Sequence, residues 1–71
     1  MEYVEVRYPK RRVVRMDGQD AGFTNETLMV EEGHHTFDLG EPPDYTPASV
    51  EKLVQDTVSE DPLIVRDFRP K

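Results

Sequence analysis

The sequence predicts a small all-β domain, a β-sandwich of about six or seven strands. Apolar and polar residues alternate in several short segments, as they do in strands that bury one face. Glycine, proline, aspartate and asparagine separate these segments at short intervals, which is typical of tight connections between strands. With 71 residues, the chain is long enough for one hydrophobic core, so we expect residues 1–71 to form a single domain.

Two strands are predicted at the start of the chain, over residues 3–8 and 12–16. Pro9 ends the first strand, because proline has no N–H to donate to a ladder. An Asp17-Gly18 pair follows the second strand and predicts a tight turn. From the alternation, the inward-facing side chains are those of Val4, Val6, Tyr8, Val14 and Met16.

The next predicted strand covers Thr27–Glu32 and turns Leu28 and Val30 inward. The segment before it, residues 20–26, contains Gly22 and Asn25, which both tolerate positive φ. We therefore expect residues 20–26 to form an irregular turn or a short extended stretch.

Gly33 turns the chain into a further strand, residues 34–39, which holds both histidines of the chain. One face is expected to carry His35, Phe37 and Leu39, with the last two in the core, and the other face His34, Thr36 and Asp38. Because neighbouring side chains of a strand point to opposite faces, the two histidines cannot chelate one ion. We expect no metal site and no cofactor here; the outward face remains a candidate surface contact.

Residues 46–59 allow two interpretations. Thr46 can cap a helix and Pro47 suits its first turn, and apolar residues recur at helical spacing, so an α+β domain with a helix at about 47–59 is one prediction. The alternative is a strand near Val50–Gln55 followed by a turn. In both cases the branched apolar residues of Pro62–Phe68 predict a closing strand.

The spacing of turn and apolar residues between about 13 and 45 resembles the PEGA family of small all-β modules. The matching residues are Asp17, Gly18, Gly22, Thr24, Leu28, Val30, Gly33, His35, Phe37, Leu39 and Tyr45. The sequence departs from the family pattern at Asn25, where proline is common, and at Asp44, where glycine is common. The resemblance covers roughly half the chain by short motifs.

This resemblance implies a sandwich of the immunoglobulin or transthyretin type, in which residues 49–55 form a strand because pairing in a sheet overrides a local helical preference. It also implies an accessory module, found in larger and often envelope-associated proteins. The family offers no catalytic residues to carry over to this chain.

The charge of the chain is unevenly distributed. The net charge is −6, yet five of the 9 basic residues fall close together; they are Arg7, Lys10, Arg11, Arg12 and Arg15. The other 4 basic residues are outnumbered by 15 acidic ones, so the rest of the surface is expected to be acidic. An acidic surface repels nucleic acid in general. The basic group is nevertheless a candidate contact for an anion or a partner, or else a solvated hairpin that balances the acidic remainder.

The composition narrows the functional classes further. The chain has no cysteine, so disulfides and thiol chemistry are absent, and Ser49 and Ser59 lack the glycines of a nucleophile elbow. We expect no enzyme. With no signal peptide or membrane-spanning segment in the sequence, we expect a cytoplasmic protein.

We therefore expect a non-catalytic protein-interaction or structural module with an unknown protein partner. Self-association through an open sheet edge, such as the first or last strand, is part of this hypothesis. The alternative is polyanion or nucleic-acid binding through the Arg7–Arg15 hairpin. The two differ in whether Lys10, Arg11 and Arg12 share one free face beside Tyr3 or are paired with acids such as Glu5 and Asp17.

Overall fold

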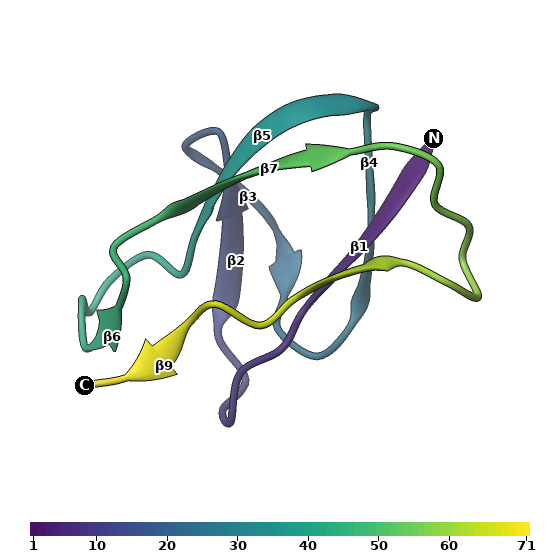
Figure 1. Cartoon of the computed structure of the whole chain (residues 1–71). Helices are drawn as coiled ribbons and strands as arrows, with labels where there is room; N and C mark the ends of the chain where they lie inside the picture. Colours follow the sequence, from purple (N-terminus) through teal and green to yellow (C-terminus); the bar gives the residue numbers. More distant parts are fainter.

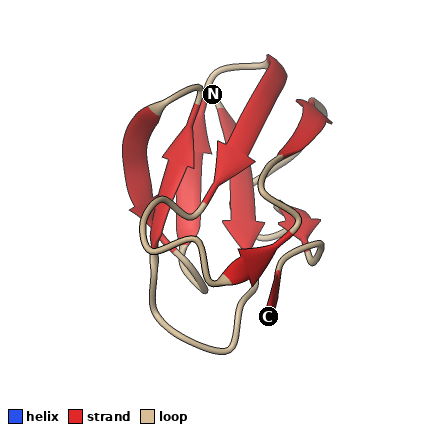
Figure 2. Cartoon of the chain, turned by 90° about the vertical axis from the view of Figure 1, so that its left-hand side faces the viewer, coloured by secondary structure: helices blue, strands red, loops and turns tan.

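The computed structural model describes all residues 1–71, and every regular element in it is a strand (Figure 1, Figure 2). The strands are β1 (Glu2–Val6), β2 (Val13–Met16), β3 (Gln19–Phe23), β4 (Thr27–Val30), β5 (Gly33–Asp38), β6 (Tyr45–Thr46), β7 (Val50–Val54), β8 (Leu63–Val65) and β9 (Arg69–Pro70). The predicted all-β class is therefore confirmed.

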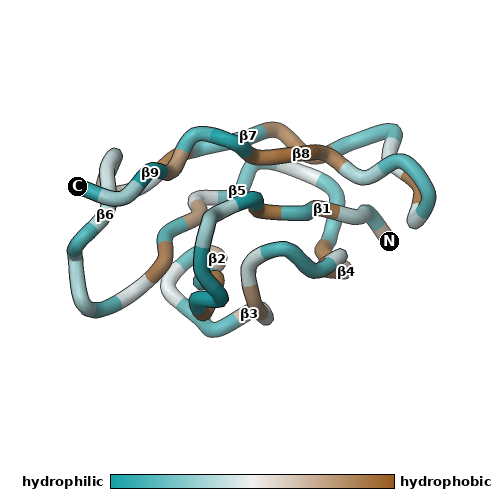
Figure 3. The backbone as a smooth tube through the Cα atoms, turned by 90° about the horizontal axis from the view of Figure 1, so that it is seen from below, coloured by the Kyte–Doolittle hydropathy of each residue, from teal (hydrophilic) through white to brown (hydrophobic).

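The strands form three sheets. One has the order β4-β1-β8, the second β3-β2-β5-β7, and β6 pairs with β9 alone. All pairings are antiparallel except that of β1 with β8, which is parallel. Figure 3 shows β8, β1 and β4 one below the other at one end of the molecule. The first strand is thus the centre of its sheet and offers no open edge.

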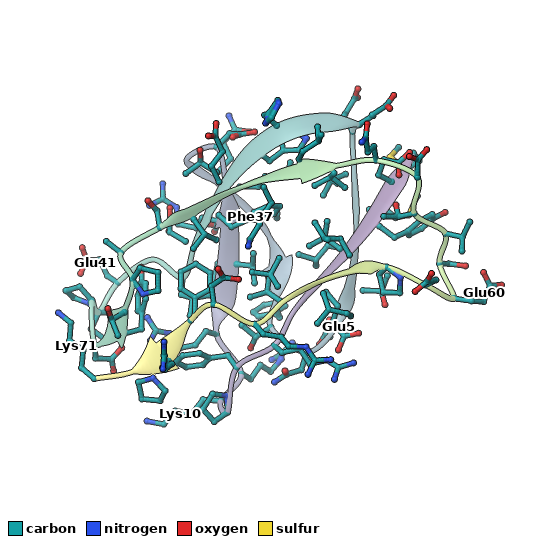
Figure 4. The ribbon with its side chains drawn as sticks, viewed as in Figure 1. Glu5, Lys10, Phe37, Glu41, Glu60 and Lys71 are labelled. Atoms are coloured by element: carbon teal, nitrogen blue, oxygen red, sulfur yellow. The ribbon has the colours of Figure 1, made fainter.

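Both larger sheets contribute to one hydrophobic core. Phe37 lies in its middle (Figure 4) and is fully buried. The inward faces expected from the alternation are confirmed for each predicted strand, although Met16 is only partly buried. The twelve buried apolar residues are Val4, Val6, Tyr8, Val14, Leu28, Val30, Phe37, Leu39, Tyr45, Val54, Val65 and Phe68.

The Asp17-Gly18 turn is confirmed. Its φ angles are 54° and 84°, and it joins the paired residues Met16 and Gln19. Two positive φ angles in a two-residue loop define the type I′ turn, whose twist suits a hairpin. Residues 20–26 are partly extended and partly a turn, as expected, because β3 continues the hairpin as far as Phe23 and a turn follows at residues 24–26.

Gly22 is the point at which the hairpin approaches the other sheet. Its φ is 149°, and a Cβ atom there would collide with the Leu28 side chain of β4. Glycine therefore lets β3 and β4 meet, and only three residues, 24–26, are needed to carry the chain from one sheet to the other.

The strand predicted near Val50–Gln55 is confirmed, and the alternative of a helix at about 47–59 is wrong. Val50–Val54 pairs with β5 over five residues, from Phe37 opposite Val50 to Gly33 opposite Val54. This pairing gives hydrogen-bond partners to the backbone of residues 50–54 and turns Val50 and Val54 toward the core. The stability gained in this way outweighs the local preference for a helix that the apolar spacing indicates. Asp56, at φ 59°, then takes a conformation that no helix accommodates.

The closing strand is shorter than predicted. β8 contains only Leu63–Val65, and the chain then bends so that β9 can pair with β6. Phe68 is buried between these pieces and meets Tyr45 edge-on, with ring centroids 5.6 Å apart. The C-terminal segment is thereby anchored by an aromatic pair.

Candidate functional site

The five clustered cations do not share a free face. Four of them are paired with acids: Arg7 with Glu5 at 2.9 Å, Arg11 with Glu26 at 3.7 Å, Arg12 with Asp44 at 2.6 Å, and Arg15 with Asp20 at 3.9 Å. Lys10 alone makes no ion pair, and it lies at the tip of the β1–β2 connection (Figure 4). Of the acids named from the sequence, Glu5 is a partner and Asp17 is not. This arrangement matches a hairpin that balances neighbouring acids better than it matches a phosphate-binding face.

Arg12 has a structural role that its place in the cluster did not reveal. Its side chain is only 12% exposed, and it donates to the Pro42 carbonyl at 2.8 Å, to the Leu39 carbonyl at 3.2 Å and to Asp44. The guanidinium lies 5.2 Å from the Tyr45 ring centre. The same guanidinium, through its hydrogen bond, holds the pKa of Asp44 below its usual value. Arg12 therefore fastens the segment between β5 and β6.

Thr24 and Asn25 hold the β1–β2 connection in place. The buried Thr24 hydroxyl accepts the Arg12 N–H at 2.8 Å and donates to the Lys10 carbonyl at 2.7 Å. Asn25 exchanges two hydrogen bonds with the backbone of Tyr8, at 3.1 and 2.7 Å. Asn25 has φ 64° and donates its own N–H to Val6, so the proline that is common here in the PEGA pattern would not fit.

The predicted outer face of β5 lies where the alternation put it. His34 and Thr36 are exposed, and Asp38 is half-buried and accepts the Gly40 N–H at 2.8 Å. His34 stands opposite Leu53 of β7. The face is a polar surface with one apolar neighbour, and nothing in it forms a closed site.

His35 joins two turns, which the sequence did not indicate. Its Nδ1 lies 2.7 Å from Asp17 Oδ2 in the β2–β3 turn, and its Nε2 lies 2.7 Å from the Glu31 carbonyl in the β4–β5 turn. The Asp17 carboxylate also accepts the Thr36 N–H at 2.9 Å. The side chain is 11% exposed and meets Phe37 edge-on. The alternation of β5 predicted that the His35 side chain points inward. It could not predict the register of β2 against β5, which brings Asp17 beside His35.

The pKa values of this pair follow from the contact. The hydrogen bond to Asp17 raises the pKa of His35, with a smaller contribution from the Glu31 carbonyl. In return, the hydrogen bond from His35 lowers the pKa of Asp17. Both ring nitrogens face acceptors, so only the imidazolium, with two N–H groups, satisfies both.

Three of the four strands that border the larger sheets carry features that discourage pairing with another chain. β3 has exposed charge at Asp20 and a register shift in its pairing with β2. β7 has a charged residue at an inward position, Lys52, which reaches Asp67 at 3.1 Å. β8 is three residues long and follows Pro62.

The fourth border strand, β4, has none of these features. Its four residues are uncharged, and Met29 on its outer side is 63% exposed. The N–H of Tyr3, opposite Met29, donates to Thr57 Oγ1 at 2.7 Å on the far side of β1. Tyr3 and Met29 are therefore a non-hydrogen-bonded pair, and the N–H and C=O of Met29 point away from β1 toward the open edge.

No group of three or more histidine or acidic side chains is placed to hold a metal ion, and no pocket opens on the surface. None of the elements is a helix with the length and hydropathy needed to cross a membrane. Comparisons with models of protein families, with curated proteins and with solved structures found no match.

Proposed function

We propose that this chain is a non-catalytic protein-interaction module that binds an extended segment of its partner along the open edge of β4. The observation that carries the proposal is made at Met29, in an uncharged border strand. Its apolar side chain is exposed, and its backbone N–H and C=O point toward the open edge of the sheet. An added strand satisfies such groups and gains specificity from alternate side chains.

The resemblance to the PEGA family supports the same class of function, an accessory module without catalytic residues. A sheet of three strands against a sheet of four also supports a sandwich of the immunoglobulin type, although the parallel pairing of β1 with β8 departs from a purely antiparallel arrangement. Polyanion binding has weaker support, because four of the five clustered cations are already paired.

A selection from a library of random extended peptides tests this proposal. The selected peptides should shift the backbone amide resonances of Thr27–Val30 in titrations followed by NMR. Met29→Lys should abolish their binding, because a lysine on the border strand opposes pairing. The matched control is Leu53→Lys, which makes the same change at an exposed position of β7 and should leave binding intact. Peptides that map to another surface, or that bind both variants equally, would refute the proposal.

A further inference from the structure

The two ends of the β4 edge differ in charge. At the start of the strand, Glu26 is paired with Arg11 at 3.7 Å. At its end, Glu31 and Glu32 are both exposed and neither makes an ion pair. The open edge is therefore neutral in its middle, balanced at one end and doubly acidic at the other.

The acidic end is held in a fixed place relative to the strand. His35 Nε2 lies 2.7 Å from the Glu31 carbonyl, and His35 belongs to β5, which is paired on both sides within its own sheet. The backbone that carries the two carboxylates is thus tied to the body of the protein. A partner that meets them does not first have to order this turn.

A second copy of this chain that pairs about Met29 is a poor occupant of the edge. The backbone N–H and C=O of Met29 face the open edge, so an antiparallel pair of two β4 strands can centre on this residue. Glu26 of each copy then stands opposite Glu32 of the other. Like charges placed directly opposite each other destabilise a strand pair.

From this charge pattern, and resting on the proposed function of β4, we infer that the partner is an uncharged β-forming segment with basic residues at one end. In an antiparallel addition, the more stable geometry, the N-terminal end of the added segment lies beside Glu31 and Glu32. The partner therefore has two lysines or arginines immediately before a run of about four alternating residues. The structure offers those cations two free carboxylates and offers an acidic segment only repulsion.

Three synthetic peptides, capped at both ends to remove terminal charge, test this inference. The first is Lys-Lys-Thr-Ile-Thr-Val-Thr, the second has the two lysines at the C-terminal end, and the third has glutamines in their place. In buffer of about 20 mM ionic strength, the first should bind about 5- to 10-fold more tightly than the third, as two exposed ion pairs allow. The difference in affinity between the first and third peptides should shrink as salt is added. The first peptide should also bind more tightly than the second.

Two variants make the test specific. Glu31→Gln combined with Glu32→Gln should remove the preference for the first peptide, while Glu51→Gln, at an exposed acid of β7, should preserve it. Equal binding of all three peptides at β4 would overturn the charge assignment and leave the proposed function standing. Failure of all three to bind would overturn this inference, whereas the library selection decides the proposed function separately. A dimer that Met29→Lys disperses in sedimentation would show that the occupant is a second copy.

Discussion

His35 is the side chain whose charge the fold controls most directly. Its pKa is raised above the ordinary value by Asp17, so the stability gained from the contact is fully present below the unfolded-state pKa of about 6.5. It is lost as the pH rises through the higher folded-state pKa. Asp17, with its lowered pKa, stays ionised throughout that range. The groups around the ring are Asp17, the turn at Glu31, and Lys52, which is opposite His35 in β7.

We therefore expect the free energy of unfolding to fall as the pH rises from about 6 through the raised pKa of His35, by on the order of 1 kcal/mol, the typical net value of one hydrogen bond. Urea titrations at several pH values measure this change. His35→Gln should remove the pH dependence, while His34→Gln, at the exposed neighbour, should retain it. A pH profile that follows His34 instead would contradict the assignment.

Thr24 is the one buried polar residue of the chain, at 1% exposure. Thr24→Val keeps the shape of the side chain but leaves the Arg12 N–H and the Lys10 carbonyl without their partner. Leaving such groups unpaired costs about 2–3 kcal/mol, and urea unfolding should show a loss of that size. Thr36→Val, at an exposed site, should change the free energy by less than about 0.5 kcal/mol. Similar losses for the two variants would refute the role given to Thr24.

At the scale of the elements, the alternation of apolar residues predicted which faces are buried, because period two depends only on neighbours along the chain. The Asp17-Gly18 turn was predictable for the same reason. Register was not, since the contact of Asp17 with His35 depends on how β2 pairs with β5. The helical spacing of residues 47–59 was a local signal that long-range pairing with β5 outweighed. The border position of β4 likewise depends on strand order, which no local pattern encodes.

The outward direction of the Met29 N–H gives a test of the β4 edge that needs no ligand. Met29→Pro removes a donor that makes no bond within the fold, and prolines are tolerated at such positions of border strands. We expect a loss of at most about 1 kcal/mol. Leu28→Pro removes an N–H that faces β1 together with a buried side chain, and should cost more than about 3 kcal/mol. Urea denaturation compares the two, and equal losses would show that the backbone directions are assigned wrongly.

At the scale of the whole molecule, β4 is the one border of the two larger sheets without a feature that discourages association. Of the two strands named for self-association, the first, β1, lies between β4 and β8 and has no open edge. The predicted closing strand corresponds to β8, which borders its sheet but has only three residues. The charged residue that protects β7 lies in the row of inward side chains, between Val50 and Val54. Its ammonium reaches Asp67, in the segment between β8 and β9.

Lys52→Val tests whether this lysine keeps the molecule monomeric. The substitution makes the inward row of β7 fully apolar, and Asp67, which is 38% exposed, stays hydrated without its partner. Folding should therefore be retained, while the unprotected edge becomes able to pair with a second copy. Sedimentation velocity over a wide range of protein concentration should show dimers or larger species for Lys52→Val, and monomers for the original chain and for Lys52→Arg, which keeps the charge. A monomeric Lys52→Val protein would mean that the twist or the surroundings of β7, and not its lysine, prevent association.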